Sequence, residues 1–148
     1  TIGMARLHTG QDAKLDGMLM RIQNDLFDLG ADLCTPDRGE KLDYEPLRII
    51  PTQVERIEKE IDDLNSNLQP LRSFVLPAGT PAAAALHLAR TVSRRAERLM
   101  VELSRQPAEA VSEPALQFIN RLSDFLFVAS RYANLKEGDV LWTPGKNR

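Results

Sequence analysis

The stretch TPAAAALHLARTVSRRAERLMVELS, residues 80–104, has the pattern of a long amphipathic helix. Thr80 and Pro81 are residues that favour a helix cap and a first helical turn. At about 100° per residue, the apolar side chains of this stretch share one side of the helix. They are Leu86, Leu88, Ala89, Val92, Ala96, Leu99, Met100 and Leu103. The stretch therefore predicts one long helix that buries a single face.

The same period recurs on both sides of this helix. Residues 11–34 carry a narrow apolar stripe that ends before Pro36, and a capping box at 52–55 opens a further helix. Ser112 opens the last helix, which reaches about Asn134, while residues 1–8 have the pattern of a helix already under way. No period-two pattern persists, apart from a short extended piece at 73–76. The sequence predicts an all-α fold, a five-helix antiparallel bundle in which residues 1–148 form a single domain.

Composition excludes several classes of protein. The chain has 148 residues, 43% of them hydrophobic, with 19 basic and 21 acidic side chains, and this balance argues against a nucleic-acid binder. No apolar run approaches the roughly 20 residues of a membrane span. Cys34 is the only cysteine, which rules out an internal disulfide and favours a reducing, cytoplasmic setting. The histidines and the cysteine lack metal-site spacing, so no metal site is predicted, and neither common glycine-rich phosphate loop is present.

The polar side of residues 80–104 is a candidate binding surface. It carries Arg90, Arg94 and Arg98 on successive turns, together with His87 and Glu97. Aligned guanidinium groups repel one another modestly in water, but each can bind phosphate oxygens through paired hydrogen bonds. The pattern indicates a site for a polyanion. A solvated face, or arginines paired with acids of a neighbouring helix, is the alternative.

The last helix and the connector before Thr80 are two further candidates. One side of the last helix is rich in short polar side chains, which favours packing against a partner or lining a site, with a polar seam between helices as the alternative. That side consists of Asn120, Ser123, Asp124, Phe127, Ser130, Arg131 and Asn134. The connector 71–80 is apolar for a loop and carries Phe74. It either covers the core or enters a ligand pocket, and its chemistry alone favours a cover for the core.

Three segments, taken together, resemble one family. They are FVLPAGT at 74–80, LHLARTVSRRAER at 86–98, and INRLSDFLF at 119–127 running on to ASRYAN at 129–134. They are similar to the PduO-type ATP:cob(I)alamin adenosyltransferases, and residues 2–8 and 21–31 match as well. The resemblance implies a five-helix bundle assembled as a homotrimer, with active sites between subunits. It also implies transfer of the 5′-deoxyadenosyl group of ATP, with Mg²⁺, to cob(I)alamin, releasing triphosphate.

The resemblance assigns ATP contacts to two helices. Within the motif RRAER, the matching residues are Arg94, Arg95, Glu97 and Arg98. In the last helix, Asn120 matches the asparagine that opens the family's NRLSD motif.

Two other residues match family positions with different roles. Arg90 matches an arginine that pairs with an acidic residue near the N-terminus and organises the site. Phe74 matches the phenylalanine on the lower face of the corrin, where it excludes the axial ligand. Four-coordinate cob(II)alamin is easier to reduce, so Phe74, Arg90 and Arg94 are the catalytic candidates.

Parts of the family pattern lie outside residues 1–148. The glycine- and threonine-rich ATP loop is expected upstream of the first helix, as is the acidic partner of Arg90. A cobalamin reductase and an adenosylcobalamin-dependent enzyme are the expected partners. The alternative function is a non-catalytic trimeric carrier that delivers adenosylcobalamin to such an enzyme. Trp142, in the tail, is expected either to cover the corrin or to pack on a neighbouring subunit.

Overall fold

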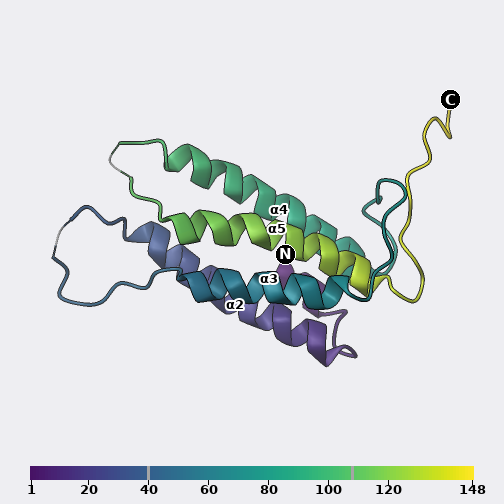
Figure 1. Cartoon of the computed structure of the whole chain (residues 1–148), viewed down its shortest axis with the longest axis horizontal. Helices are drawn as coiled ribbons and strands as arrows, with labels where there is room; N and C mark the ends of the chain where they lie inside the picture. The colour runs from purple at the N-terminus through teal and green to yellow at the C-terminus, as the bar shows by residue number, and fades with distance from the viewer. Residues whose placement is uncertain (40, 108) are drawn as a thin grey trace.

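Four long helices and one short helix form the bundle. The computed structural model describes residues 1–39, 41–107 and 109–148. The helices are α1 (Ile2–Arg6), α2 (Ala13–Cys34), α3 (Pro51–Asn65), α4 (Pro81–Leu103) and α5 (Glu113–Ala133). Successive long helices run in opposite directions along the molecule (Figure 1). The predicted all-α, five-helix antiparallel bundle is confirmed, and in the described part of the chain the extended piece at 73–76 makes one isolated bridge, between Val75 and Leu141.

Side-chain caps begin the two helices that carry the site. The Thr80 hydroxyl accepts a hydrogen bond from the Ala83 N–H at 3.1 Å, and the Ser112 hydroxyl accepts one from the Ala115 N–H at 3.3 Å. Each cap satisfies a backbone donor that the first helical turn leaves free. Both predicted starts are therefore confirmed.

The predicted cap of α3, Thr52, is wrong by two residues. The helix begins at Pro51, and Ile50 rather than Thr52 occupies the cap position. Because Ile50 has no side-chain acceptor, the first turn is tied back by Gln53, whose Oε1 accepts from the Ile50 N–H at 3.0 Å. Proline suits the first helical position, since its ring sets a helical φ and it lacks the unused N–H.

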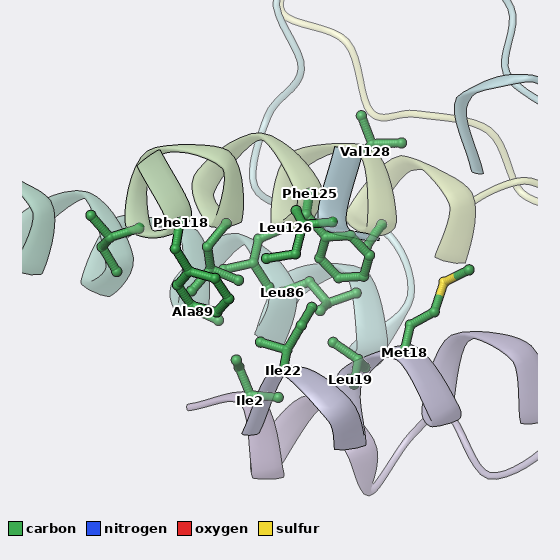
Figure 2. Packing of buried hydrophobic residues seen from close by; sticks show 14 of the residues in the cluster. Ile2, Met18, Leu19, Ile22, Leu86, Ala89, Phe118, Phe125, Leu126 and Val128 are labelled. Atoms are coloured by element: carbon green, nitrogen blue, oxygen red, sulfur yellow. The ribbon is translucent and has the colours of Figure 1, made fainter. Parts of the chain in front are cut away.

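The core lies where α5 meets the other helices. Figure 2 shows Phe118 and Phe125 of α5, Leu86 of α4, and Leu19 and Ile22 of α2 directed into one interior. All five are fully buried. Burial of an aromatic or aliphatic side chain of this size contributes about 1.5–3 kcal/mol, so α5 is the helix around which the bundle is built.

The buried stripe of α4 is narrower than its apolar side. Leu86, Ala89 and Met100 are buried, whereas Leu88 is 47% and Leu99 59% exposed. Ser93, which is polar, lies inside the buried stripe at 6% exposure. The core of the chain therefore uses only part of the apolar surface that α4 provides, and Leu88 and Leu99 face outward.

The connector between α3 and α4 is fixed to the end of α5 around Gly79. The backbone of Gly79 has φ of 102°, and a Cβ atom there would lie 2.4 Å from the side chain of Asn134. Asn134 is 1% exposed, accepts from the Thr80 N–H at 2.8 Å and donates to the Ala78 carbonyl at 3.0 Å. The asparagine side chain thus replaces the backbone partners that this turn lacks.

Gly79→Ala is expected to destabilise the protein by about 2 kcal/mol or more, because alanine adds left-handed backbone strain and displaces Asn134. The measurement is the free energy of unfolding in urea. Gly10→Ala is the matched control, since a Cβ at Gly10 would have nothing within 4 Å. Equal stability of the two variants would contradict the role given to Asn134.

Candidate functional site

A hydrogen-bonded network joins the arginine side of α4 to α5. Glu97 lies at its centre, with one carboxylate oxygen accepting from Arg94 and the other accepting from the Asn120 amide at 2.7 Å. The side-chain oxygen of Asn120, Oδ1, accepts in turn from the guanidinium group of Arg121 at 2.6 Å. The structure thus brings together three residues that the sequence assigned to ATP. The side chain of Arg94 is 46% exposed and that of Glu97 13%, so the arginine faces outward from a fixed carboxylate.

The other arginines of α4 have no ion pair among the described residues. Arg90 lies over the ring of Phe127, with its guanidinium carbon 5.2 Å from the ring centroid. This contact holds the cation by its attraction to the aromatic face. Arg95 and Arg98 are exposed. Four guanidinium groups on one helix, only one of them matched by a carboxylate, form a site that can accept a polyanion.

Phe74 lies at one end of the bundle, on the connector. It is 77% exposed, so the expectation that this apolar connector covers the core is wrong. The connector instead pairs with the C-terminal tail: the Trp142 N–H donates to the Phe74 carbonyl at 2.8 Å, and the Leu76 N–H donates to the Val140 carbonyl at 2.8 Å. The rings of Phe74 and Trp142 meet edge to face, 5.8 Å between centroids. An exposed aromatic pair of this kind fits a flat apolar ligand.

Phe74 and the arginine network are far apart within one chain. Arg94 lies 13 residues beyond the start of α4 at Pro81, which corresponds to about 20 Å along the helix axis. The connector that carries Phe74 is attached at that start. The structure therefore forms two groups, an arginine network at mid-helix and an aromatic pair at the bundle end, rather than one compact pocket.

Part of the polar side of α5 is buried inside the chain, between α5 and its neighbours. Ser123, Ser130, Arg131 and Asn134 are all buried. Ser123 and Ser130 donate to carbonyls of their own helix, at 2.9 and 2.7 Å. Asn120 instead belongs to the site. The alternative interpretation, a polar seam between helices, thus applies to the four buried residues, whereas Asn120 fits the interpretation that this side lines a site.

His87 is a residue that sequence reasoning placed on the polar side of α4, yet it is only 2% exposed. Its ring lies edge-on to Phe127, 6.3 Å between centroids, and neither ring nitrogen has a hydrogen-bond partner in the described structure. Burial, followed by the positive charge of Arg90, lowers the pKa of His87, while Asp139 opposes this shift. Nothing in the helical period distinguishes a buried histidine from an exposed one at this position.

His87 is expected to make folding less favourable in acid. Because the unfolded chain binds a proton at this ring near pH 6.5 and the folded chain does not, the free energy of unfolding decreases as the pH falls below about 6.5. His87→Gln should reduce this slope, measured by urea unfolding between pH 7 and 5. His8→Gln, at the exposed histidine, should retain it; an unchanged slope in His87→Gln would contradict the account.

Membrane-spanning helices and clustered metal ligands are both absent from the described residues. No helix among them has both the length and the apolar character needed to cross a membrane. Within the same residues, no group of three or more His, Cys, Asp or Glu side chains is placed to hold a metal ion.

The geometry defines a class of protein: an all-helical bundle with a helix face that carries four arginines and with a separate exposed aromatic pair. The chain belongs to the cobalamin adenosyltransferase family, whose model matches residues 1–133. The family and enzyme class predicted from the three sequence segments are therefore confirmed.

Individual relatives agree with this membership. A corrinoid adenosyltransferase of Mycobacterium tuberculosis is 48% identical over 147 residues, covering 99% of this chain and 75% of that protein. A human corrinoid adenosyltransferase is 43% identical over 124 residues, covering 82% of this chain and 48% of that protein. A solved variant of a PduO-type ATP:corrinoid adenosyltransferase from Lactobacillus reuteri, complexed with cobalamin and ATP, superposes with a TM-score of 0.82 at 38% identity. It covers 95% of this chain and 77% of that one.

Proposed function

We propose that this protein transfers the 5′-deoxyadenosyl group of ATP to cob(I)alamin, forming adenosylcobalamin and triphosphate. The observation that carries the proposal is the outward-facing Arg94, fixed by Glu97 and Asn120 across α4 and α5. The family membership and the neighbouring structure complexed with cobalamin and ATP support it. Residues 1–148 act in this proposal as one domain.

The reaction moves one group between two substrates. The electron pair of cob(I)alamin attacks the 5′-carbon of ATP and forms the cobalt–carbon bond, while the bond from that carbon to the triphosphate oxygen breaks. The triphosphate leaves with the bonding electrons and gains negative charge at the oxygen that was bonded to the 5′-carbon. Arg94, Arg95 and Arg98 are proposed to stabilise this charge, because fixed cations act most strongly where charge develops, whereas Arg90 is proposed to organise the site.

Glu97 and Asn120 have a different part in this proposal. One oxygen of Glu97 accepts from Arg94 and the other from Asn120, so Glu97 is proposed to orient Arg94 as well as to contact ATP together with Asn120. Asn120 fixes Glu97 through its amide and keeps that role while ATP is bound. Mg²⁺ is proposed to arrive with the ATP phosphates, since Mg²⁺ is commonly held by substrate phosphates and few protein ligands.

Phe74 is proposed to meet the lower face of the corrin. An exposed ring there offers an apolar surface and no ligand atom, so it can exclude water and other axial ligands from cobalt. Four-coordinate cob(II)alamin then accepts an electron more readily. A cobalamin reductase that supplies the electron, and an adenosylcobalamin-dependent enzyme that takes the product, are the proposed partners, in the cytoplasm.

A homotrimer with sites between subunits is proposed for two reasons. Leu88 and Leu99 leave an apolar surface on α4, and Phe27, 84% exposed on α2, lines a largely apolar cavity of about 240 Å³ beside α4. Such surfaces are usually covered by another chain. In addition, Phe74 and Arg94 of one chain lie far apart, so a neighbouring subunit can bring the complementary group. The measured mass in solution should be that of three chains.

The test of function is an absorbance assay with chemically reduced cobalamin and Mg-ATP, using the full protein. Loss of the cob(I)alamin spectrum and appearance of a light-sensitive product that depends on ATP would support the enzyme. Cobalamin binding without ATP-dependent turnover would support the carrier instead. Absence of both binding and turnover would overturn the proposal.

A further inference from the structure

Arg131, near the end of α5, contacts two segments that are remote from each other in sequence. Its Nε donates to Asp139 in the tail at 2.8 Å, and its Nη2 donates to the Gln69 carbonyl in the connector at 2.7 Å. The side chains of Arg131 and Asp139 are 9% and 14% exposed, so this ion pair is largely shielded from water. One guanidinium group thus holds the connector and the tail against α5.

The segments held in this way are those that carry the aromatic pair. Residues 73–76 and 140–142, here called the strap, form a short antiparallel ribbon at one end of the bundle (Figure 1). The Ser73 hydroxyl adds a hydrogen bond to the Trp142 carbonyl at 2.7 Å.

The strap has little burial to hold it. Phe74 is 77% exposed and Trp142 44%. A two-stranded ribbon with so little buried surface is marginally stable on its own. Its order must therefore come from its attachments to the bundle.

The two attachments differ in what they hold. The Asn134 side chain binds the backbone on both sides of Gly79 and so fixes the connector, while its backbone carbonyl accepts from the N–H groups of Glu137 and Gly138 at the start of the tail. Arg131 binds both the connector and the tail. Without Arg131, the tail beyond Gly138 would be attached to the rest of the molecule only through the hydrogen bonds of the strap. Asp139 would also be left as a shielded carboxylate without its cation, which is costly.

We infer that Arg131 is a positioning residue that makes the connector and the tail move as one unit, so that Phe74 is presented to a flat apolar macrocycle in a fixed orientation. The inference rests on the proposed function for the identity of that macrocycle. Its structural part, the coupling of Phe74 and Trp142 through Arg131, stands without it.

The first measurement uses Trp142, the only tryptophan of the chain. In Arg131→Gln, its emission should shift to the red and its quenching by acrylamide should increase, while the helical circular dichroism stays unchanged. Arg72→Gln, which removes an exposed connector arginine, should behave as the unaltered protein. Should Arg131→Gln fail to fold, Asp139→Asn tests the same coupling with a smaller change. Emission and quenching identical to the unaltered protein in a folded variant would overturn the inference.

The second measurement separates positioning from general stability. Arg131→Gln should slow adenosylation from cob(II)alamin on the order of tenfold more than adenosylation from pre-reduced cob(I)alamin, with the KM for ATP unchanged. Equal losses from both forms would leave Arg131 a purely structural residue and overturn its positioning role. If the unaltered protein shows no turnover, the proposed function fails, but the Trp142 measurement still decides the coupling.

Discussion

Replacing Arg94 with alanine is expected to lower kcat/KM for ATP by about 10²-fold while the mass in solution stays that of the unaltered protein. The guanidinium group has five donors, and only one nitrogen is engaged by Glu97, so the others are available to a phosphate. In the proposed mechanism, alanine removes a charge-assisted contact that strengthens as the triphosphate departs. The measurement is steady-state turnover with varied ATP, accompanied by the mass in solution.

Two further variants sharpen this prediction. Arg94→Lys keeps the charge but loses the planar fork, so its turnover should lie between those of the alanine variant and the unaltered protein. Arg105→Ala, at an exposed arginine beyond the end of α4, should leave the kinetics unchanged. Unchanged kinetics in Arg94→Ala would remove this residue from the proposed mechanism.

Phe74→Ala is expected to slow adenosylation from cob(II)alamin by about 10²-fold and to slow the reaction from pre-reduced cob(I)alamin at least about tenfold less. In the proposed function, the ring excludes an axial ligand that matters only before the last reduction, because cob(I)alamin does not keep that ligand. The two rates are measured with the same protein. One assay contains a reductant that takes cobalamin only to cob(II)alamin, together with a reductase for the last electron. The other contains a stronger chemical reductant that supplies cob(I)alamin directly.

The control for Phe74 is another exposed aromatic residue. Tyr44 is 61% exposed in the loop between α2 and α3, at the end of the bundle opposite the strap (Figure 1). Tyr44→Ala should change neither rate. An equal loss from cob(II)alamin and cob(I)alamin in Phe74→Ala would show that the ring contributes to binding alone.

The helices were predictable because their signals are local. Thr80 and Ser112 satisfy donors three residues away, and a helical period needs only its own neighbours to be recognised. The pairing of Glu97 with Arg94 could also be predicted from the sequence, since residues three apart share a helix face. The start of α3 was missed because Ile50, at the cap position, has no side-chain acceptor. The side chain of Gln53 instead accepts a hydrogen bond from the Ile50 N–H.

The rest depends on distant contacts. Arg131 bonds to a carbonyl 62 positions earlier in the chain, and no periodic pattern contains that partner. The exposure of Phe74 follows from the pairing of the connector with the tail, which the composition of the connector does not reveal. Leu88 and Leu99 appear as core residues in a helical wheel. A wheel shows that a residue lies on the apolar side of a helix, but it does not show whether that residue is buried within its own chain or lies at the surface of the chain.

The central place of α5 has a consequence for how the protein is made. Phe118 and Phe125 are fully buried, yet they belong to α5, which is synthesised after α1, α2, α3 and α4. At about 5–20 residues per second, α5 follows the end of α4 by a delay on the order of seconds. During that interval α2, α3 and α4 have emerged with their apolar stripes uncovered. The nascent chain is therefore expected to depend on chaperones most strongly just before residue 133 leaves the ribosome.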